Sequence, residues 1–286
     1  MFAQVYKNTH KTLFRSKLFY LALIVVFAIS IATAIRGGGG YYVVETQETI
    51  YDTDPRFELH MQPYVQNTSN FVTSYLLYIM PVFTVITTVI VMSRDWRDRF
   101  FEIEKAADVK PSRYLLGRIA ALVTVNFAVM VLLPFVQFYI YVFTRGGLYG
   151  VSTMDMIADS SVRLMRNIVL EGWPCVLMYM GLTYACGWLF KSGTMGGVCG
   201  MSYLVSYFFL FSYYRFRLFP FYFDYLSPRP EKLTMFLHYY DSEWHYLSAG
   251  REETTWPLAL TCVAILLGAA LVYFLISYWR TKKREY

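Results

Sequence analysis

The chain alternates long apolar runs with shorter polar segments. Each run holds about 20 mostly apolar residues, the length that an α-helix needs to cross the hydrocarbon core of a bilayer. These runs occupy residues 18–35, 71–92, 114–142, 168–190, 194–213 and 256–279. The pattern therefore predicts an all-α integral membrane protein with six transmembrane helices in one transmembrane domain, residues 1–286.

The segment before the first run, residues 1–17, is amphipathic at the helical period. One side holds Phe2, Val5, Tyr6, Thr9 and Leu13, and the other holds Gln4, Lys7, Asn8, Lys11 and Arg15. We expect an interfacial helix that lies flat on the inner leaflet, in contact with membrane lipid. A cleaved secretory signal is the alternative, because Ala32-Thr33-Ala34 resembles a cleavage site.

The distribution of lysine and arginine predicts the orientation of the spans. Basic residues are densest in residues 1–17, in residues 93–113 and after residue 279, which favours cytoplasmic placement of both termini. The chain is thus expected to be a multi-pass protein of the cell membrane, with residues 36–70 and the segment 214–255 outside. Arg118 lies in the first turns of the third span, and we expect its long side chain to reach the cytoplasmic interface.

Composition narrows the class of protein further. Hydrophobic residues make up 56% of the chain and charged residues only 16%, which is typical of a membrane domain. The net charge of +6 follows from basic residues at the ends of the runs, so we expect no nucleic-acid partner. The cysteines, which are Cys175, Cys186, Cys199 and Cys262, all fall inside predicted spans, and we expect neither disulfides nor metal sites from them.

The segment 93–113 between the second and third spans carries the clearest functional pattern. Residues 99–109 contain good helix formers, and Pro111 is expected to end that helix. Phe100, Ile103 and Ala107 form one stripe, whereas Glu104 and Asp108 form another. A short amphipathic helix joined to two spans can place its apolar stripe in a groove of another protein. An ordinary solvated loop helix is the alternative.

The run FEIEKAADVKPSRYLLGR at residues 101–118 resembles the coupling segment of ABC-2 type exporter permeases. The layout of an interfacial helix, six spans and a large outer segment before the last span is similar as well. The resemblance implies the permease subunit of an ATP-driven ABC exporter. In such an exporter, Phe100, Ile103, Glu104, Ala107 and Asp108 would couple the chain to a separate ATP-binding subunit.

The chain contains no Gly-x-x-x-x-Gly-Lys-Ser/Thr motif, so we expect it to be no ATPase and to have no cofactor of its own, with ATP bound by the partner subunit. The resemblance also implies a second permease subunit, either an identical copy or a sister chain. Gly196 and Gly200 form a Gly-x-x-x-Gly pair that favours close helix packing, within the chain or against that second subunit.

Two other functions are kept as alternatives. His238, Asp241 and His245 are spaced so that a helix would bring them to one face, which would suit a membrane-embedded metal-dependent enzyme. The aromatic residues around them are instead typical of a membrane interface. A structural or assembly membrane protein without transport activity is the other alternative. The near absence of charge within the spans favours an amphipathic cargo over a small ion.

Overall fold

The structure is a computed structural model of the chain. It describes residues 2–36, 40–43, 48–51, 79–98, 102–103, 110–145, 172–206 and 256–283. The other residues, which include the His238 cluster and the outer segment 214–255, lie outside the described part.

Helices form nearly all of the described secondary structure, as predicted. They are α1 (Phe2–Phe14), α2 (Lys17–Arg36), α4 (Met80–Arg97), α6 (Pro111–Arg145), α8 (Trp173–Phe190), α9 (Gly193–Ser206) and α12 (Trp256–Lys283). α2 and α12 coincide with the first and last apolar runs to within a few residues. α6 extends beyond the third run at both ends, whereas α4, α8 and α9 are described over ranges shorter than or shifted from their runs.

Pro111 was expected to end the helix 99–109, of which residues 104–109 lie outside the described part of the chain. Lys110 is not helical, and Pro111 is the first residue of α6, whose first backbone hydrogen bonds return from Arg113 and Tyr114 to the carbonyl of Lys110. Proline suits this position because an N–H group in the first turn of a helix has no partner within the helix, so proline loses no hydrogen bond by lacking one. The third helix is therefore longer at its start than the apolar run alone suggests.

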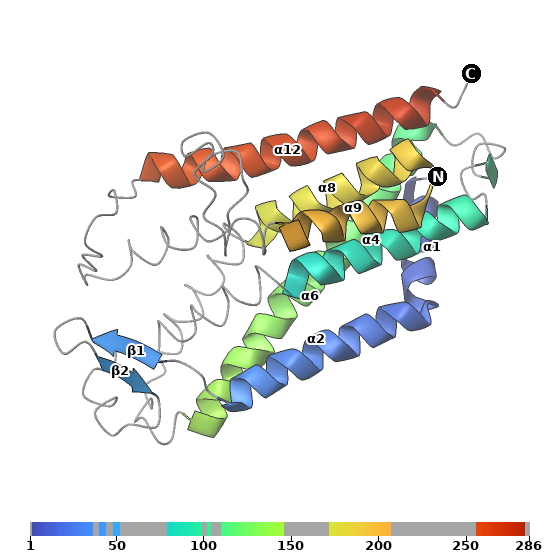
Figure 1. The fold of residues 1–286 in the computed structure, drawn as a ribbon. Coiled ribbons are helices and arrows are strands. Elements are labelled where there is room, and N and C mark those ends of the chain that lie inside the picture. Colours follow the sequence, from blue (N-terminus) through green and yellow to red (C-terminus); the bar gives the residue numbers. More distant parts are fainter. Residues whose placement is uncertain are drawn as a thin grey trace.

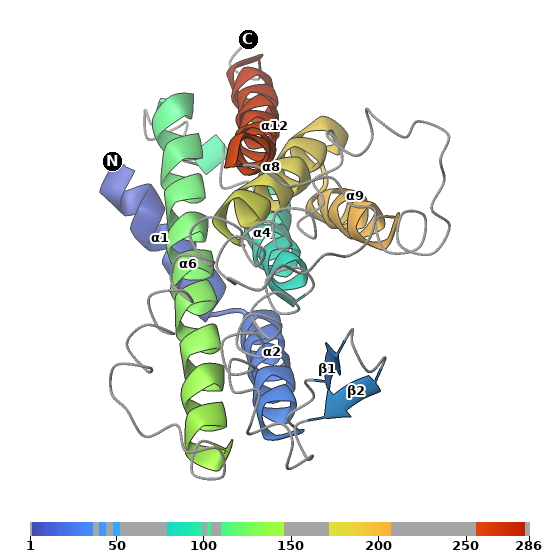
Figure 2. The same ribbon diagram turned by 90° about the vertical axis from the view of Figure 1, so that its left-hand side faces the viewer.

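The helices are arranged around α4, which lies between α2, α6, α8 and α9 (Figure 2). α1 crosses the beginning of α6 and meets α2 at a bend of 69°. α12 packs along α8 on the far side of the bundle (Figure 1). Both termini, the end of α4 and the turn from α8 to α9 lie at one end of the molecule, on the right in Figure 1.

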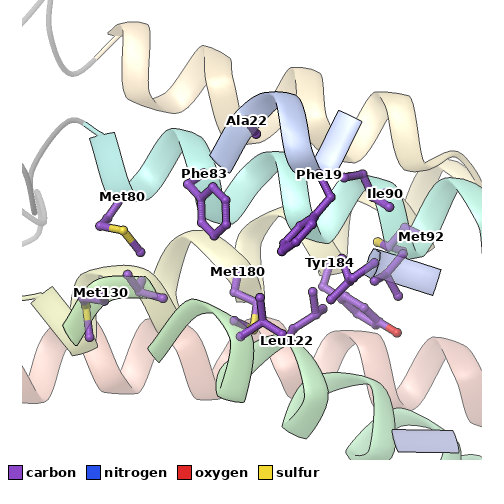
Figure 3. Close-up of a cluster of buried hydrophobic side chains, with 14 of the residues drawn as sticks. Phe19, Ala22, Met80, Phe83, Ile90, Met92, Leu122, Met130, Met180 and Tyr184 are labelled. Atoms are coloured by element: carbon purple, nitrogen blue, oxygen red, sulfur yellow. The ribbon is translucent and has the colours of Figure 1, made fainter. Parts of the chain in front are cut away.

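The core lies where α2, α4, α6 and α8 meet (Figure 3). Phe19 of α2 packs against Phe83 of α4, with ring centroids 6.0 Å apart. Leu122 of α6 and Met180 of α8 complete this contact and are fully buried. Large side chains from four separate helices thus interlock, which holds α4 at the centre of the bundle.

One element was not predicted. Strands β1 (Gly40–Val43) and β2 (Glu48–Tyr51) form an antiparallel hairpin in which Gly40 pairs with Tyr51 and Val43 with Glu48. It falls in the segment 36–70, which the sequence pattern placed outside the membrane. The four-residue strands are too short to add a layer to the bundle, so the described part of the chain is helical with one small hairpin.

Among the described residues, one helical stretch meets the requirements of a membrane span in length and apolar composition, namely Ser112–Leu133 of α6. The bent pair Phe2–Phe14 and Lys17–Ala32 qualifies as a second if both parts belong to one span. These stretches favour association with a membrane. They do not by themselves establish the six spans that the apolar runs predict.

Candidate functional site: a buried ion pair beside the segment 93–113

An ion pair joins the two helices that flank the candidate coupling segment. Asp95 lies in the last turn of α4 and Arg118 in the third turn of α6, and the shortest distance between carboxylate and guanidinium is 2.5 Å, from Oδ1 to Nη2. Arg118 is only 1% exposed and Asp95 only 5%. A charge so deeply buried is stable only when an opposite charge and hydrogen bonds compensate the loss of water.

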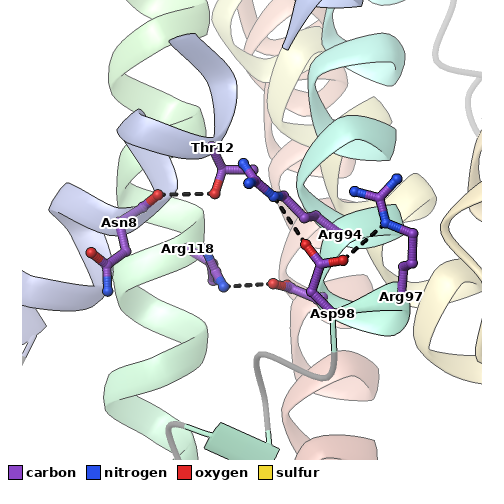
Figure 4. Close-up of polar contacts among 7 residues, drawn as sticks. Asn8, Thr12, Arg94, Arg97, Asp98 and Arg118 are labelled. Atoms are coloured by element: carbon purple, nitrogen blue, oxygen red, sulfur yellow. Dashed lines mark hydrogen bonds and ion pairs between the residues drawn. The ribbon is translucent and has the colours of Figure 1, made fainter. Parts of the chain in front are cut away.

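The N-terminal helix takes part in the same cluster. Nη1 of Arg118 donates a hydrogen bond to Oγ1 of Thr9 in α1, at 2.9 Å. The ring of Tyr114 lies one turn before Arg118, with the guanidinium carbon 5.2 Å from its centroid. One arginine therefore links α1, α4 and α6, and Figure 4 shows it between the first two of these helices.

The expectation that Arg118 reaches the membrane interface was wrong. Its side chain points into the bundle because Asp95 and Thr9, which are distant in sequence, provide a carboxylate and a hydroxyl there. The helical period of α4 does indicate that Asp95 is buried, because it lies four residues after Val91 and three after Met92, which are both buried. No comparable local signal marks Thr9 as a partner of Arg118.

A close approach of backbones brings α1 to this cluster. A Cβ atom added at Gly117 would lie 2.8 Å from Cγ1 of Val5, which is nearer than real Cβ contacts come. Val5, Thr9 and Leu13 of α1 are buried. Because these residues face protein, only part of the apolar side predicted for α1 is left for lipid.

A second polar contact fastens α4 to α6 deeper in the bundle. Thr84 donates a hydrogen bond to Oδ1 of Asn126 at 3.0 Å, and Nδ2 of Asn126 donates to Thr87 at 3.1 Å and to the carbonyl of Leu122 at 2.9 Å. All of these side chains are buried. Polar contacts at two levels therefore hold α4 and α6 in one relative position.

The end of α4 carries a further, exposed charge cluster. Asp98 accepts hydrogen bonds from Arg97 at 2.9 Å and from Arg94 at 3.1 Å (Figure 4). The hydrogen bond from Arg97 is the main reason that the pKa of Asp98 lies below its ordinary value, and Arg94 acts in the same direction. The two arginines compensate the charge of Asp98 at the point within the segment 93–113 where the chain leaves α4.

Few of the residues predicted to contact an ATPase are described. Ile103 lies in a helical turn and is 58% exposed, next to the exposed Glu102. The other predicted coupling residues lie outside the described part of the chain, and they are Phe100, Glu104, Ala107 and Asp108. Ile103 is thus a large apolar residue exposed at the end of the molecule where the ion pair lies.

The two glycines of the Gly-x-x-x-Gly pair face helices of the same chain. A Cβ atom at Gly196 would lie 2.5 Å from the carbonyl oxygen of Thr183 in α8. At Gly200 it would lie 2.5 Å from Oγ1 of Thr183 and 2.9 Å from Cγ2 of Val85 in α4. These contacts leave no room for a second subunit at the inner face of α9.

The described residues contain no group of three His, Cys, Asp or Glu side chains arranged to hold a metal ion. Cys175, Cys186 and Cys199 are free thiols.

Comparisons of the chain with protein-family models, with curated proteins and with solved structures found no match.

Proposed function

We propose that the chain is the permease subunit of an ATP-driven exporter of the cell membrane. It crosses the membrane six times with both termini in the cytoplasm and forms the translocation path together with a second permease subunit. A separate ATP-binding subunit docks on the segment 93–113. The residues of this chain that meet it are Phe100, Ile103, Glu104, Ala107 and Asp108.

The surfaces of the helices support a membrane location. Ile24 of α2 is 65% exposed, and Leu271 of α12 is 60% exposed. α8 and α9 contain no charged residue. Water-soluble proteins seldom leave such continuous apolar surfaces uncovered, whereas lipid or a second membrane subunit covers them without cost.

The orientation proposed for the spans agrees with the arrangement of the helices. Among the described residues, six helices follow the interfacial helix α1, and the two termini, the described residues of the segment 93–113 and the turn at Lys191 share one end of the molecule (Figure 1). This is the end that basic residues mark as cytoplasmic. An ATPase in the cytoplasm would meet the segment 93–113 at this end.

The buried contact of Arg118 with Asp95 and Thr9 is the observation that carries the proposed coupling. A segment that transmits force needs rigid attachment at both ends, since a loose joint would absorb the displacement. The ion pair provides this rigidity because it holds the end of α4 to the start of α6 and ties α1 to both. A push on the segment 93–113 would thus move three helices together.

The test is to disturb the apolar stripe and the acidic stripe of the segment separately. Ile103→Asp and Phe100→Asp remove apolar contact with the ATPase, and Glu104→Lys reverses a charge. Burial of one large apolar side chain contributes roughly 2 kcal/mol to docking, so each apolar variant should lower the affinity more than tenfold. Co-purification with a candidate ATP-binding subunit and the hydrolysis rate of that subunit are the measurements.

Lys191→Gln is the matched control, because Lys191 lies exposed in the turn between α8 and α9 at the same end of the molecule. It should leave both measurements unchanged. If the three variants of the segment 93–113 also bind and stimulate the ATPase normally, the segment is an ordinary solvated loop and the proposal fails.

A further inference from the structure

The orientation of α1 about its own axis is set by its buried face. Val5 packs against Gly117, and Thr9 accepts the hydrogen bond of Arg118. Lys7 and Lys11 lie half a helical turn away from these residues and are exposed. The side of α1 that carries these two lysines is therefore directed away from the protein.

A row of aromatic rings lies between the buried side and the basic side of α1. Phe2, Tyr6, His10 and Phe14 follow one another at intervals of four residues, and neighbouring ring centroids are 6.4, 4.5 and 5.9 Å apart. Phe2 and Phe14, at the two ends of the row, are 44% and 50% exposed. The row would expose the apolar rings of Phe2 and Phe14 to water if nothing covered it.

The basic side of α1 forms no ion pair with an acidic residue among the described residues. No aspartate or glutamate occurs in the chain before Glu45. Within the part of the chain that the structure describes, none of Lys7, Lys11, Arg15 and Lys17 forms an ion pair. Lys7 and Lys11 lie on α1, Arg15 in the turn after it and Lys17 at the start of α2, and mutual repulsion of these nearby charges favours a negatively charged surface as their partner.

A similar group of residues ends the chain at the same end of the molecule. Nζ of Lys283 lies 4.0 Å from the ring centroid of Trp279, and the guanidinium of Arg280 lies 5.5 Å from it. These side chains are exposed. Tryptophan beside basic residues is typical of the level of lipid headgroups, because the ring is amphipathic and the cations meet phosphates.

We propose that α1 binds anionic phospholipids of the inner leaflet. Its row of aromatic rings lies between the headgroups, and Lys7, Lys11, Arg15 and Lys17 hold the lipid phosphates. The exposed apolar rings beside the cations favour a lipid surface over an acidic protein, because lipid offers acyl chains to the rings as well as phosphates to the cations. This inference rests on the membrane location proposed above and is independent of the exporter function.

The test measures which lipid lies against α1 in the full-length chain. The protein is reconstituted into phosphatidylcholine vesicles that contain a photoreactive analogue of either phosphatidylglycerol or phosphatidylcholine. After illumination, lipid adducts on peptides from residues 2–17 are quantified by mass spectrometry, with a protease that does not cut at lysine. We expect the anionic analogue to give at least about fivefold more adduct, since each basic residue near the surface favours it roughly fivefold.

The variant Lys7→Gln/Lys11→Gln should lower adducts of the anionic analogue at least about fivefold and leave those of the neutral analogue unchanged. Lys7→Arg/Lys11→Arg should retain them, because the charge is kept. Lys110→Gln/Lys191→Gln is the matched control, which removes two exposed lysines from the same end of the molecule and should also retain them.

Equal labelling of α1 by the two analogues, or labelling by the anionic analogue that Lys7→Gln/Lys11→Gln leaves unchanged, would overturn the proposal. Labelling of α12 but not of α1 would overturn it as well and would indicate that α1 faces another protein. None of these measurements involves an ATPase, so failure here is distinct from failure of the exporter proposal.

Discussion

The stability of a charged residue buried inside a helical bundle depends on the groups that contact it. Arg118 and Asp95 compensate each other's charge across the contact of α4 with α6, and Thr9 satisfies a second nitrogen of the arginine. Removal of either residue leaves the other buried as a charge that neither water nor an opposite charge compensates. The pair therefore specifies which faces of α1, α4 and α6 meet, whether or not it adds net stability over an apolar contact.

Arg118→Met should destabilise the protein by about 3 to 5 kcal/mol, because it leaves the carboxylate of Asp95 buried without a counter-charge. The double variant Asp95→Asn/Arg118→Met should be more stable than Arg118→Met alone, because it buries no charge. Unfolding by denaturant in detergent micelles, followed by tryptophan fluorescence, gives the free energies. Asp95→Asn alone completes the cycle, and simple additivity of the two single losses would contradict an interaction between these residues.

At the scale of whole helices, close backbone contact determines how α9 lies against α8 and α4. The small residues Gly196 and Gly200 allow this approach, since any side chain at either position would meet atoms of Thr183. The backbone nitrogen of Gly187 in α8 lies 3.0 Å from the Cβ position of Gly196, whereas a Cβ atom at Gly187 itself would meet Met92 of α4. Glycine thus provides space for close packing on both helices.

Gly196→Ala should destabilise the protein by roughly 1 to 3 kcal/mol, because the new methyl group meets the backbone carbonyl of Thr183, which cannot rotate away. Gly268→Ala in α12 is the matched control. A Cβ atom there has no neighbour within 4 Å, so the higher helix propensity of alanine should leave stability unchanged or slightly raised. The midpoint of thermal unfolding of both purified variants is the measurement. Equal midpoints would show that α9 is free to shift.

At the scale of the molecule, the proposed orientation places the two ends of the chain together in the cytoplasm. Green fluorescent protein fused after Tyr286 should fluoresce, and alkaline phosphatase at the same position should be inactive. The same reporters inserted after Gly150, between α6 and α8, should give the opposite pattern. An active phosphatase at the carboxyl terminus would refute the proposed orientation and, with it, the cytoplasmic position of the segment 93–113.

Much of the helical content follows from the sequence because the signal is local. A run such as 18–35 is apolar on all sides and ends at charged residues, and α2 occupies Lys17–Arg36. The helical form of residues 2–14 is likewise visible in the period of their polar residues. The sequence did not show whether the side of α1 with Val5, Thr9 and Leu13 contacts lipid or protein, because these residues suit either neighbour.

The sequence by itself determined where helices form, because backbone hydrogen bonds in an apolar run can be satisfied within the run. It also determined which end of each run is basic. Only the tertiary structure decided that Arg118 is buried, that Thr9 is its partner and that Gly196 faces α8. These contacts join residues far apart along the chain, and whether a charge meets water or an opposite charge depends on which helices pack together.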